Sequence, residues 1–309
     1  MKHHDTDGSP ASGRHAHGHG LTDDLPLLEA QMARRRALQW FAGAGTAALV
    51  AGCGGSGTES GSVAVVGSTA TPAPTPATMA TATPTPAATA SGCLVDPSET
   101  NGPYPADGTN TASGSTSNAL TASGIVRSDI RSSFLGTTTV ATGVSLTLTL
   151  TVVNVNAACA PLSGYAVYIW SCDRQGHYSL YTVAAESYLR GIQVTDANGQ
   201  ATFTMIVPGC YDGRWPHIHF EVFSSLSTAT SGRYASLVSQ LAMPAAVCSA
   251  VYADTATYPA SATNFARVSL SSDGVFGDNS AAQTAQQTPL LTGSVAAGYI
   301  GTALIGLAR

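Results

Sequence analysis

The sequence predicts an all-β fold, an antiparallel β-sandwich with long active-site loops, over residues 93–309. Residues 144–155 alternate apolar and polar side chains (Val-Ser-Leu-Thr-Leu-Thr-Leu-Thr-Val-Val-Asn-Val), which is the period of a half-buried strand. Residues 188–195 and 200–207 flank Asn198-Gly199, a favoured hairpin turn. No segment of this region has a convincing helical period, so a two-sheet sandwich is the expected class.

Further strands are expected at residues 164–170 and 217–223. The strand signals weaken after Ser249. Residues 290–307 are uncharged, but their glycines, serine and threonines fit closing strands better than a membrane helix.

The first 53 residues have the pattern of an export signal. Arg34-Arg35-Arg36 forms a basic region, and the uncharged run 37–52 ends in small residues directly before Cys53. This arrangement resembles a bacterial lipobox, in which the cysteine is lipidated, and the paired arginines resemble a twin-arginine signal. The expected location is the cell envelope, with Cys53 carrying a membrane anchor; the alternative is a signal peptide in which Cys53 is an ordinary residue.

Residues 54–92 are expected to form a disordered linker. They consist of Gly/Ser and then Thr-Pro-Ala repeats, such as Thr71-Pro72-Ala73-Pro74-Thr75-Pro76, with almost no charge and no aromatic residue. Such a segment cannot bury enough surface to offset the entropy of ordering. Its prolines favour an extended tether between the anchor and the folded head, residues 93–309.

Composition narrows the possible functions. Only 10% of residues are charged, the net charge is −5 and no basic stripe is present, which argues against nucleic acid as a partner. Beyond residue 20 the histidines are His177, His217 and His219, so any site that needs imidazole has three candidates.

The segment 208–220 concentrates polar residues at the start of an expected strand. Residues i and i+2 of a strand point to one face, so His217 and His219 can converge on one metal ion. A His-x-His pair is by itself a weak signal. Here a Pro-Gly turn brings Tyr211 just upstream and Arg214 lies three residues before the first histidine, which favours a metal site over packing.

Three segments carry a resemblance to a known family. Residues 208–219 read Pro-Gly-Cys-Tyr-Asp-Gly-Arg-Trp-Pro-His-Ile-His, residues 170–178 read Trp-Ser-Cys-Asp-Arg-Gln-Gly-His-Tyr, and residues 99–104 read Glu-Thr-Asn-Gly-Pro-Tyr. In this order they resemble the intradiol ring-cleavage dioxygenases, which include catechol 1,2- and protocatechuate 3,4-dioxygenases. The resemblance covers roughly residues 93–275.

The resemblance implies a non-haem Fe(III) site and assigns roles residue by residue. The metal ligands would be Tyr178, Tyr211, His217 and His219, with Tyr211 as the ligand that leaves when substrate binds. Arg214 would stand beside the substrate and stabilise negative charge. Two phenolates are hard anionic donors that favour Fe(III). The implied partners are a small aromatic diol and O₂, and the implied products are muconate-type diacids.

Two other functions are compatible with the pattern. The first is a non-catalytic, surface-anchored ligand-binding sandwich, and the second is a zinc or copper site that uses the histidine pair alone. If the substrate were protocatechuate, its carboxylate would need a cation, for which Arg174, Arg190 and Arg233 are unranked candidates.

Beyond Cys53 the sequence has five cysteines: Cys93, Cys159, Cys172, Cys210 and Cys248. In an oxidising environment they can form at most two bridges. Because a free thiol beside Tyr211 could compete for the metal or be oxidised, Cys210 is expected to be bridged, with Cys248 as its partner, or sealed in apolar packing.

Overall fold

A computed structural model of the chain describes residues 92–309. The predicted export segment 1–53 with its Cys53, and residues 54–91 of the predicted linker, lie outside the described residues. Among the helices of residues 92–309, none is long and apolar enough to cross a membrane.

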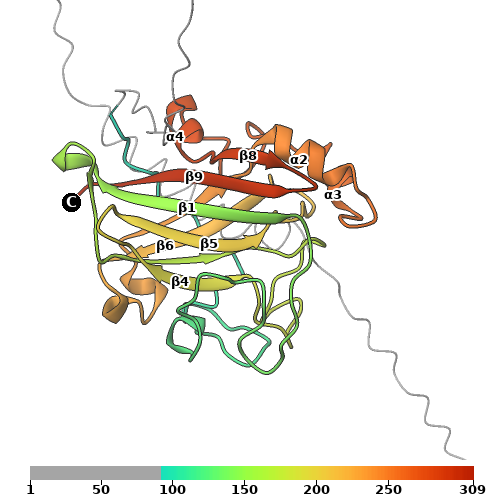
Figure 1. The fold of residues 1–309 in the computed structure, drawn as a ribbon, viewed down its shortest axis with the longest axis horizontal. Helices are drawn as coiled ribbons and strands as arrows, with labels where there is room; N and C mark the ends of the chain where they lie inside the picture. The colour runs from blue at the N-terminus through green and yellow to red at the C-terminus, as the bar shows by residue number, and fades with distance from the viewer. Residues whose placement is uncertain (1–91) are drawn as a thin grey trace, which may run out of the picture. The chain divides into compact units, whose positions relative to one another are not determined.

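Two sheets form the body of the fold (Figure 1). In the first sheet, β1 (Ser145–Asn154) pairs antiparallel with β2 (Ala160–Pro161) and β5 (Gln200–Ile206). On its other edge β1 pairs with β9 (Gly298–Leu307), which in turn pairs with β8 (Leu290–Ser294). The β1–β9 pair is parallel, which corrects the expectation of a purely antiparallel sandwich.

The second sheet is antiparallel throughout. Its order is β4 (Arg190–Val194), β3 (Ala166–Trp170), β6 (His217–Phe223) and β7 (Leu237–Ala242). The strands expected from the sequence are therefore present within one or two residues of their bounds, whereas β7 was not expected.

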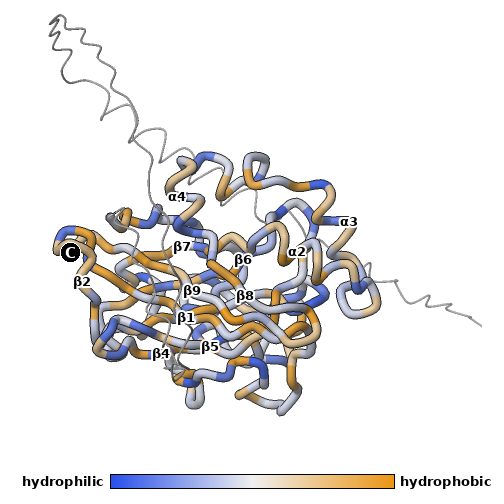
Figure 2. Tube along the Cα trace, turned by 45° about the horizontal axis from the view of Figure 1, so that its top comes forward, coloured by the Kyte–Doolittle hydropathy of each residue, from blue (hydrophilic) through white to orange (hydrophobic). Residues whose placement is uncertain are grey.

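The main core lies between the two sheets. Alternation along β1 turns Leu146, Leu148 and Leu150 inward and leaves the threonines between them partly exposed. The facing positions of β6 are Ile218, Phe220 and Val222, and all are fully buried. Figure 2 shows the hydrophobic colour concentrated along the strands. Burial of these faces is the main favourable contribution to folding.

The same alternation determines the position of the chemistry. His217 and His219 occupy the other face of β6, away from the main core, yet every residue of β6 is buried. A second apolar cluster, which joins Tyr168 and Trp170 of β3 to Leu120, Ile125 and Leu180 of the loops, covers this face. The second sheet is thus buried on both sides, and the histidines face a layer of long loops.

Short helices occupy the part of the head where no helix was expected. They are α2 (Ala245–Tyr252), α3 (Ser261–Phe265) and α4 (Ala281–Gln286), which gather on one side of the sheets in Figure 1. The 3₁₀ turns are η1 (Ala119–Thr121), η2 (Val155–Ala157), η3 (Leu226–Thr228) and η4 (Gly232–Tyr234). None of the three α-helices exceeds eight residues, too few turns for a periodic pattern to be recognised.

The disulfide is not the one expected. Cys93 pairs with Cys159, while Cys172, Cys210 and Cys248 are free and buried. The predicted Cys210–Cys248 bridge is therefore wrong. The alternative, that Cys210 is sealed in apolar packing, is confirmed, because its side chain belongs to the main core.

Replacing Cys93 and Cys159 together by serine is expected to lower the free energy of unfolding. The bridge joins residues 66 apart, and loop-closure entropy gives about 4 kcal/mol for a loop of that size. Urea denaturation of both proteins measures the change. A reductant should lower the wild-type midpoint toward that of the variant and leave the variant unchanged; equal stability of the two oxidised proteins would contradict the prediction.

Candidate metal centre

Four side chains from three segments converge on one point. His217 and His219 come from β6, Tyr178 from the loop between β3 and β4, and Tyr211 from the loop between β5 and β6. The two imidazole Nε2 atoms are 3.1 Å apart. Tyr178 Oη lies 3.4 Å from His217 Nε2 and 3.3 Å from His219 Nε2, and Tyr211 Oη lies 3.2 Å from His217 Nε2. The structure brings all four predicted ligands together.

Hydrogen bonding alone does not account for this cluster. His217 Nδ1 contacts the carbonyl oxygen of Trp215, which only accepts, so Nδ1 carries the proton. Burial, followed by the charge of Arg214, lowers the pKa of His217 to about 3, so the ring is neutral and Nε2 presents a lone pair. One lone pair cannot satisfy three neighbours at 3.1–3.4 Å.

The spacing of the donor atoms fits a shared metal ion. Two donors each about 2.1 Å from a metal, at about 90–110° to one another, are about 3.0–3.4 Å apart. The measured separations, 3.1–3.4 Å, fall in this range. Within residues 92–309 no cluster of three or more His, Cys, Asp or Glu side chains could hold a metal, so two of the four donors here have to be phenols.

The two tyrosines differ in how firmly they are held. Tyr178 is almost completely buried, and its backbone N–H donates to Thr182 Oγ1. Its ring packs 4.8 Å from the ring of Tyr104, in the 99–104 loop. Tyr211 is half-buried and lies on the turn that follows Pro208-Gly209. Tyr211 is therefore the phenol that can move away at the smaller cost.

His219 is enclosed between an aromatic ring and a glycine. Its imidazole stacks on the Trp170 indole, with centroids 4.8 Å apart and planes 4° from parallel. On the 99–104 loop, a Cβ placed at Gly102 would lie 3.1 Å from His219 Cε1. Burial, together with the charges of His217, Arg214 and Arg190, lowers the pKa of His219 well below its usual range, so this ring is also neutral.

Gly102→Ala is expected to impair the centre. Gly102 has a φ of +69°, so alanine adds about 1–2 kcal/mol of backbone strain and its methyl group crowds the His219 ring. The expected result is a weaker hold on the metal, measured as metal per protein after dialysis against a chelator. Gly164→Ala is the matched control, because Gly164 has a φ of +80° with open space around it; equal metal retention in the two variants would contradict the prediction.

Arg214 is buried beside the histidines and held by residues that the sequence did not single out. Its Nε lies 3.0 Å from Asp273 Oδ2, and its Nη2 donates to Gln240 Oε1 at 2.8 Å. Asp273 also accepts from the backbone N–H groups of Trp215, Val275 and Phe276. Burial opposes ionisation of Asp273, but Arg214 and these amides outweigh it and lower the pKa of this carboxyl.

Other predicted neighbours take structural places. His177 is half-buried in a turn where its backbone N–H donates to Asp173 Oδ1. Burial, followed by the neighbouring Cys248, raises the pKa of Cys210 to about 12. The Cys210 thiol is therefore protonated, which suppresses the competition for metal that the sequence raised as a concern.

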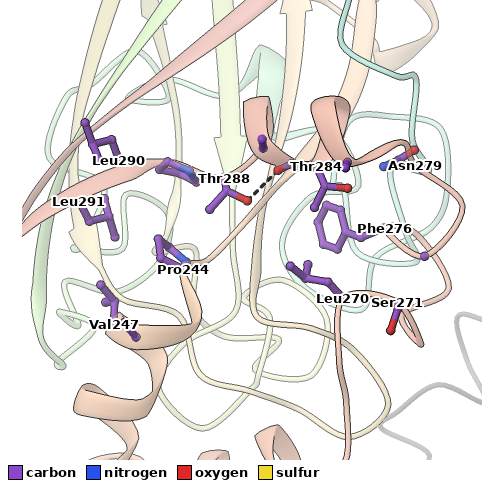
Figure 3. Close-up of a pocket in the computed structure, with 15 residues that line it drawn as sticks. Pro244, Val247, Leu270, Ser271, Phe276, Asn279, Thr284, Thr288, Leu290 and Leu291 are labelled. Carbon is purple, nitrogen blue, oxygen red and sulfur yellow. Dashed lines mark hydrogen bonds between the residues drawn. The ribbon is translucent and has the colours of Figure 1, made fainter.

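A pocket of about 960 Å³ lies apart from the four donors, between α2, residues 270–279, α4 and β8 (Figure 3). Its lining carries no charged side chain and includes Phe276, Leu270 and Val247, with a hydrogen bond from Thr288 Oγ1 to the carbonyl of Thr284 at one side. None of the four donors lines it.

The sequence model of a protein family described as Dioxygenase matches residues 128–245, the segment that contains Tyr178, Tyr211, Arg214, His217 and His219. The chain belongs to the intradiol ring-cleavage dioxygenases. It is therefore an enzyme. No curated protein gives a significant match to the sequence.

Solved dioxygenase structures share the fold. The dioxygenase Tetur07g02040 has 24% identity and a TM-score of 0.52, over 70% of this chain and 95% of that chain. An intradiol ring-cleavage dioxygenase from Tetranychus urticae has 22% identity and a TM-score of 0.49 over the same shares. The dioxygenase domain of a carbohydrate-binding fusion protein from Streptomyces sp. SirexAA-E has 23% identity and a TM-score of 0.41, over 70% of this chain and 99% of that chain.

Proposed function

We propose that this intradiol dioxygenase cleaves a catechol-type aromatic diol with O₂ at a non-haem Fe(III) ion held by Tyr178, Tyr211, His217 and His219. The observation that carries the proposal is the convergence of two phenol oxygens on two imidazole nitrogens within 3.4 Å. Two hard anionic phenolates favour iron(III) over iron(II). A zinc or copper site on the histidine pair alone gives no reason for the phenols to be there.

The overall reaction balances without a further co-reactant. The bond between the two hydroxyl-bearing carbons breaks, and each carbon gains one atom of O₂, so catechol (C₆H₆O₂) becomes a muconic diacid (C₆H₆O₄). When bound, iron(III) supplies Lewis-acid activation of the diol for reaction with O₂.

The protein residues manage charge during substrate binding. A diol that binds as a dianion releases two protons, and the Tyr211 phenolate can accept one of them at Oη as it moves out toward solvent, because Tyr211 is half-buried. Tyr178, which is almost fully buried, stays in place. Exchange of one phenolate for the incoming diolate limits the change in net charge of a buried site and hence the desolvation cost.

Arg214 supplies fixed positive potential next to the reacting ring. At His217 its effect on the pKa is larger than the opposing effect of Asp273, so the cationic end of the ion pair faces the centre. A preorganised cation stabilises negative charge that develops during reaction without reorganising.

Spectroscopy and metal analysis together test the iron proposal. The purified head is expected to contain stoichiometric iron, to absorb visible light through tyrosinate-to-iron charge transfer, and to shift that band when catechol is added. Oxygen uptake with catechol should be accompanied by one muconate-type diacid per O₂. A colourless preparation with stoichiometric zinc and full activity would overturn the proposal.

Anchoring in the cell envelope through Cys53 is the second part of the proposal and rests on the sequence. Small residues precede Cys53, and the run 37–52 follows a basic region. Cys53→Ala should move the protein from the membrane fraction to the soluble fraction, or leave an unprocessed precursor, with unchanged activity per iron. Wild-type protein free in the cytoplasm with residues 1–52 intact would disprove it.

A further inference from the structure

The arginines of the head bear on which catechols the site accepts. A diol whose ring carries a carboxylate brings an extra full charge into a buried site, and that charge needs a cation. Lys2 is the only lysine of the chain, so within the part of the chain that the structure describes the available cations are arginines. Four of them, Arg174, Arg190, Arg214 and Arg233, are the candidates.

Arg190 is fully occupied by the fold. A guanidinium has five N–H donors, and each of the five in Arg190 is matched to an acceptor. Nε donates to Ser179 Oγ, Nη1 to the Pro105 carbonyl and to Tyr168 Oη, and Nη2 to the carbonyls of Tyr104 and Ser179. Arg190 therefore fastens the loops over the second sheet and has no donor left for a substrate carboxylate.

Arg214 is already balanced by an opposite charge. The side chains of Arg214 and Asp273 are only 1% and 0% exposed, and Asp273 faces both Nε and Nη2. The pair presents a positive end to the centre, which stabilises charge that shifts locally within a bound diolate. It contributes no net charge to offset an additional carboxylate.

Arg174 and Arg233 point elsewhere. The charge of Arg174 acts on Asp254 and Tyr258, at the α2–α3 end of the head. Arg233 is exposed on η4, where its neighbour Gly232 packs against Asp107. Besides burial, the cations that depress the pKa of His219 are Arg214 and Arg190, which are the two arginines already engaged.

We propose that the site accepts catechols without a ring carboxylate and rejects carboxylated ones by charge. The inference rests on the proposed function, because it concerns the diol bound at the same four ligands. Within residues 92–309, no arginine near the histidines remains to compensate an added carboxylate, so its burial would be unpaired and costly.

Three diols separate charge from size: catechol, 3,4-dihydroxybenzoate and 3,4-dihydroxybenzamide, the last being the uncharged counterpart of the second. At neutral pH the iron-loaded enzyme should turn over the amide with a kcat/KM within about tenfold of catechol. The acid should be about a hundredfold worse than the amide, which corresponds to about 2.7 kcal/mol in transition-state binding. Comparable values for acid and amide would overturn the inference, and so would equal rejection of both, since size would then be the cause. Failure with all three diols would refute the proposed function itself.

Asp273→Asn provides a second test within one protein. It keeps an acceptor oxygen for the backbone amides and removes the charge that balances Arg214, so the acid-to-amide ratio of kcat/KM should rise about tenfold. Asp129→Asn is the matched control, because Asp129 pairs with Arg131 on the surface at 2.7 Å, and there the ratio should not change. An unchanged ratio in folded Asp273→Asn enzyme would overturn the role of the Arg214–Asp273 pair; if that variant does not fold, the three-diol comparison in the wild type still decides.

Discussion

Tyr178→Phe is expected to yield a folded protein without stoichiometric iron and without measurable turnover. The substitution removes only Oη, the atom that lies 3.3–3.4 Å from both imidazole Nε2 atoms. It keeps the ring that packs against Tyr104. The centre loses one anionic donor, and the two imidazoles and Tyr211 that remain no longer offer the hard phenolate pair that favours iron(III). Iron per protein, the visible band and oxygen uptake measure the result.

Tyr181→Phe is the matched control for this loss. Tyr181 stands on the same loop, and its hydroxyl donates to Asn110 Oδ1 and accepts from the backbone N–H of Ala106. Its removal costs hydrogen bonds but no metal donor, so iron and colour should be retained. A Tyr178→Phe protein with full iron and an unchanged visible band would show that Tyr178 is not a ligand.

The strands that carry the site were accessible to sequence analysis because their signals are local. Alternation along β1 is explicit in its residues, and the i, i+2 relation places His217 and His219 on one face wherever β6 pairs. The four converging side chains were found because each lies within a short motif around a turn, at 170–178 or 208–219. Their meeting point, by contrast, depends on how the loops fold over the second sheet.

The features that were missed depend on partners distant in sequence. Asp273 lies 59 residues from Arg214 and Gln240 lies 26 residues from it, and no local pattern links them. The parallel pairing of β1 with β9 joins the two ends of the head, whereas alternation predicts which face of a strand is buried but not which strand lies beside it. The bridge between Cys93 and Cys159 is of the same kind, since connectivity is a property of the folded chain.

Arg214→Ala is expected to retain iron and lose turnover. Arg214 is not among the four side chains whose donor atoms converge, so the centre can still assemble. Loss of one preorganised stabilising group costs about 3 kcal/mol, or about 10²–10³-fold in kcat. Single-turnover kinetics on the iron-loaded variant measure the chemical step, and the catechol-induced band shift shows whether the diol still binds. Loss of iron in this variant would mean that Arg214 supports the metal and not the reaction.

The buried partner of Arg214 allows instability to be separated from lost chemistry. Arg214→Ala leaves the Asp273 carboxylate buried without its cation, which can cost about 3–5 kcal/mol of stability. In the double variant Arg214→Ala, Asp273→Asn that charge is gone, so stability should recover in part. Turnover should not recover, because the positive potential at the diol is still missing. If kcat rose together with the melting temperature in the double variant, Arg214 would owe its effect to folding, and its catalytic role would have to be abandoned.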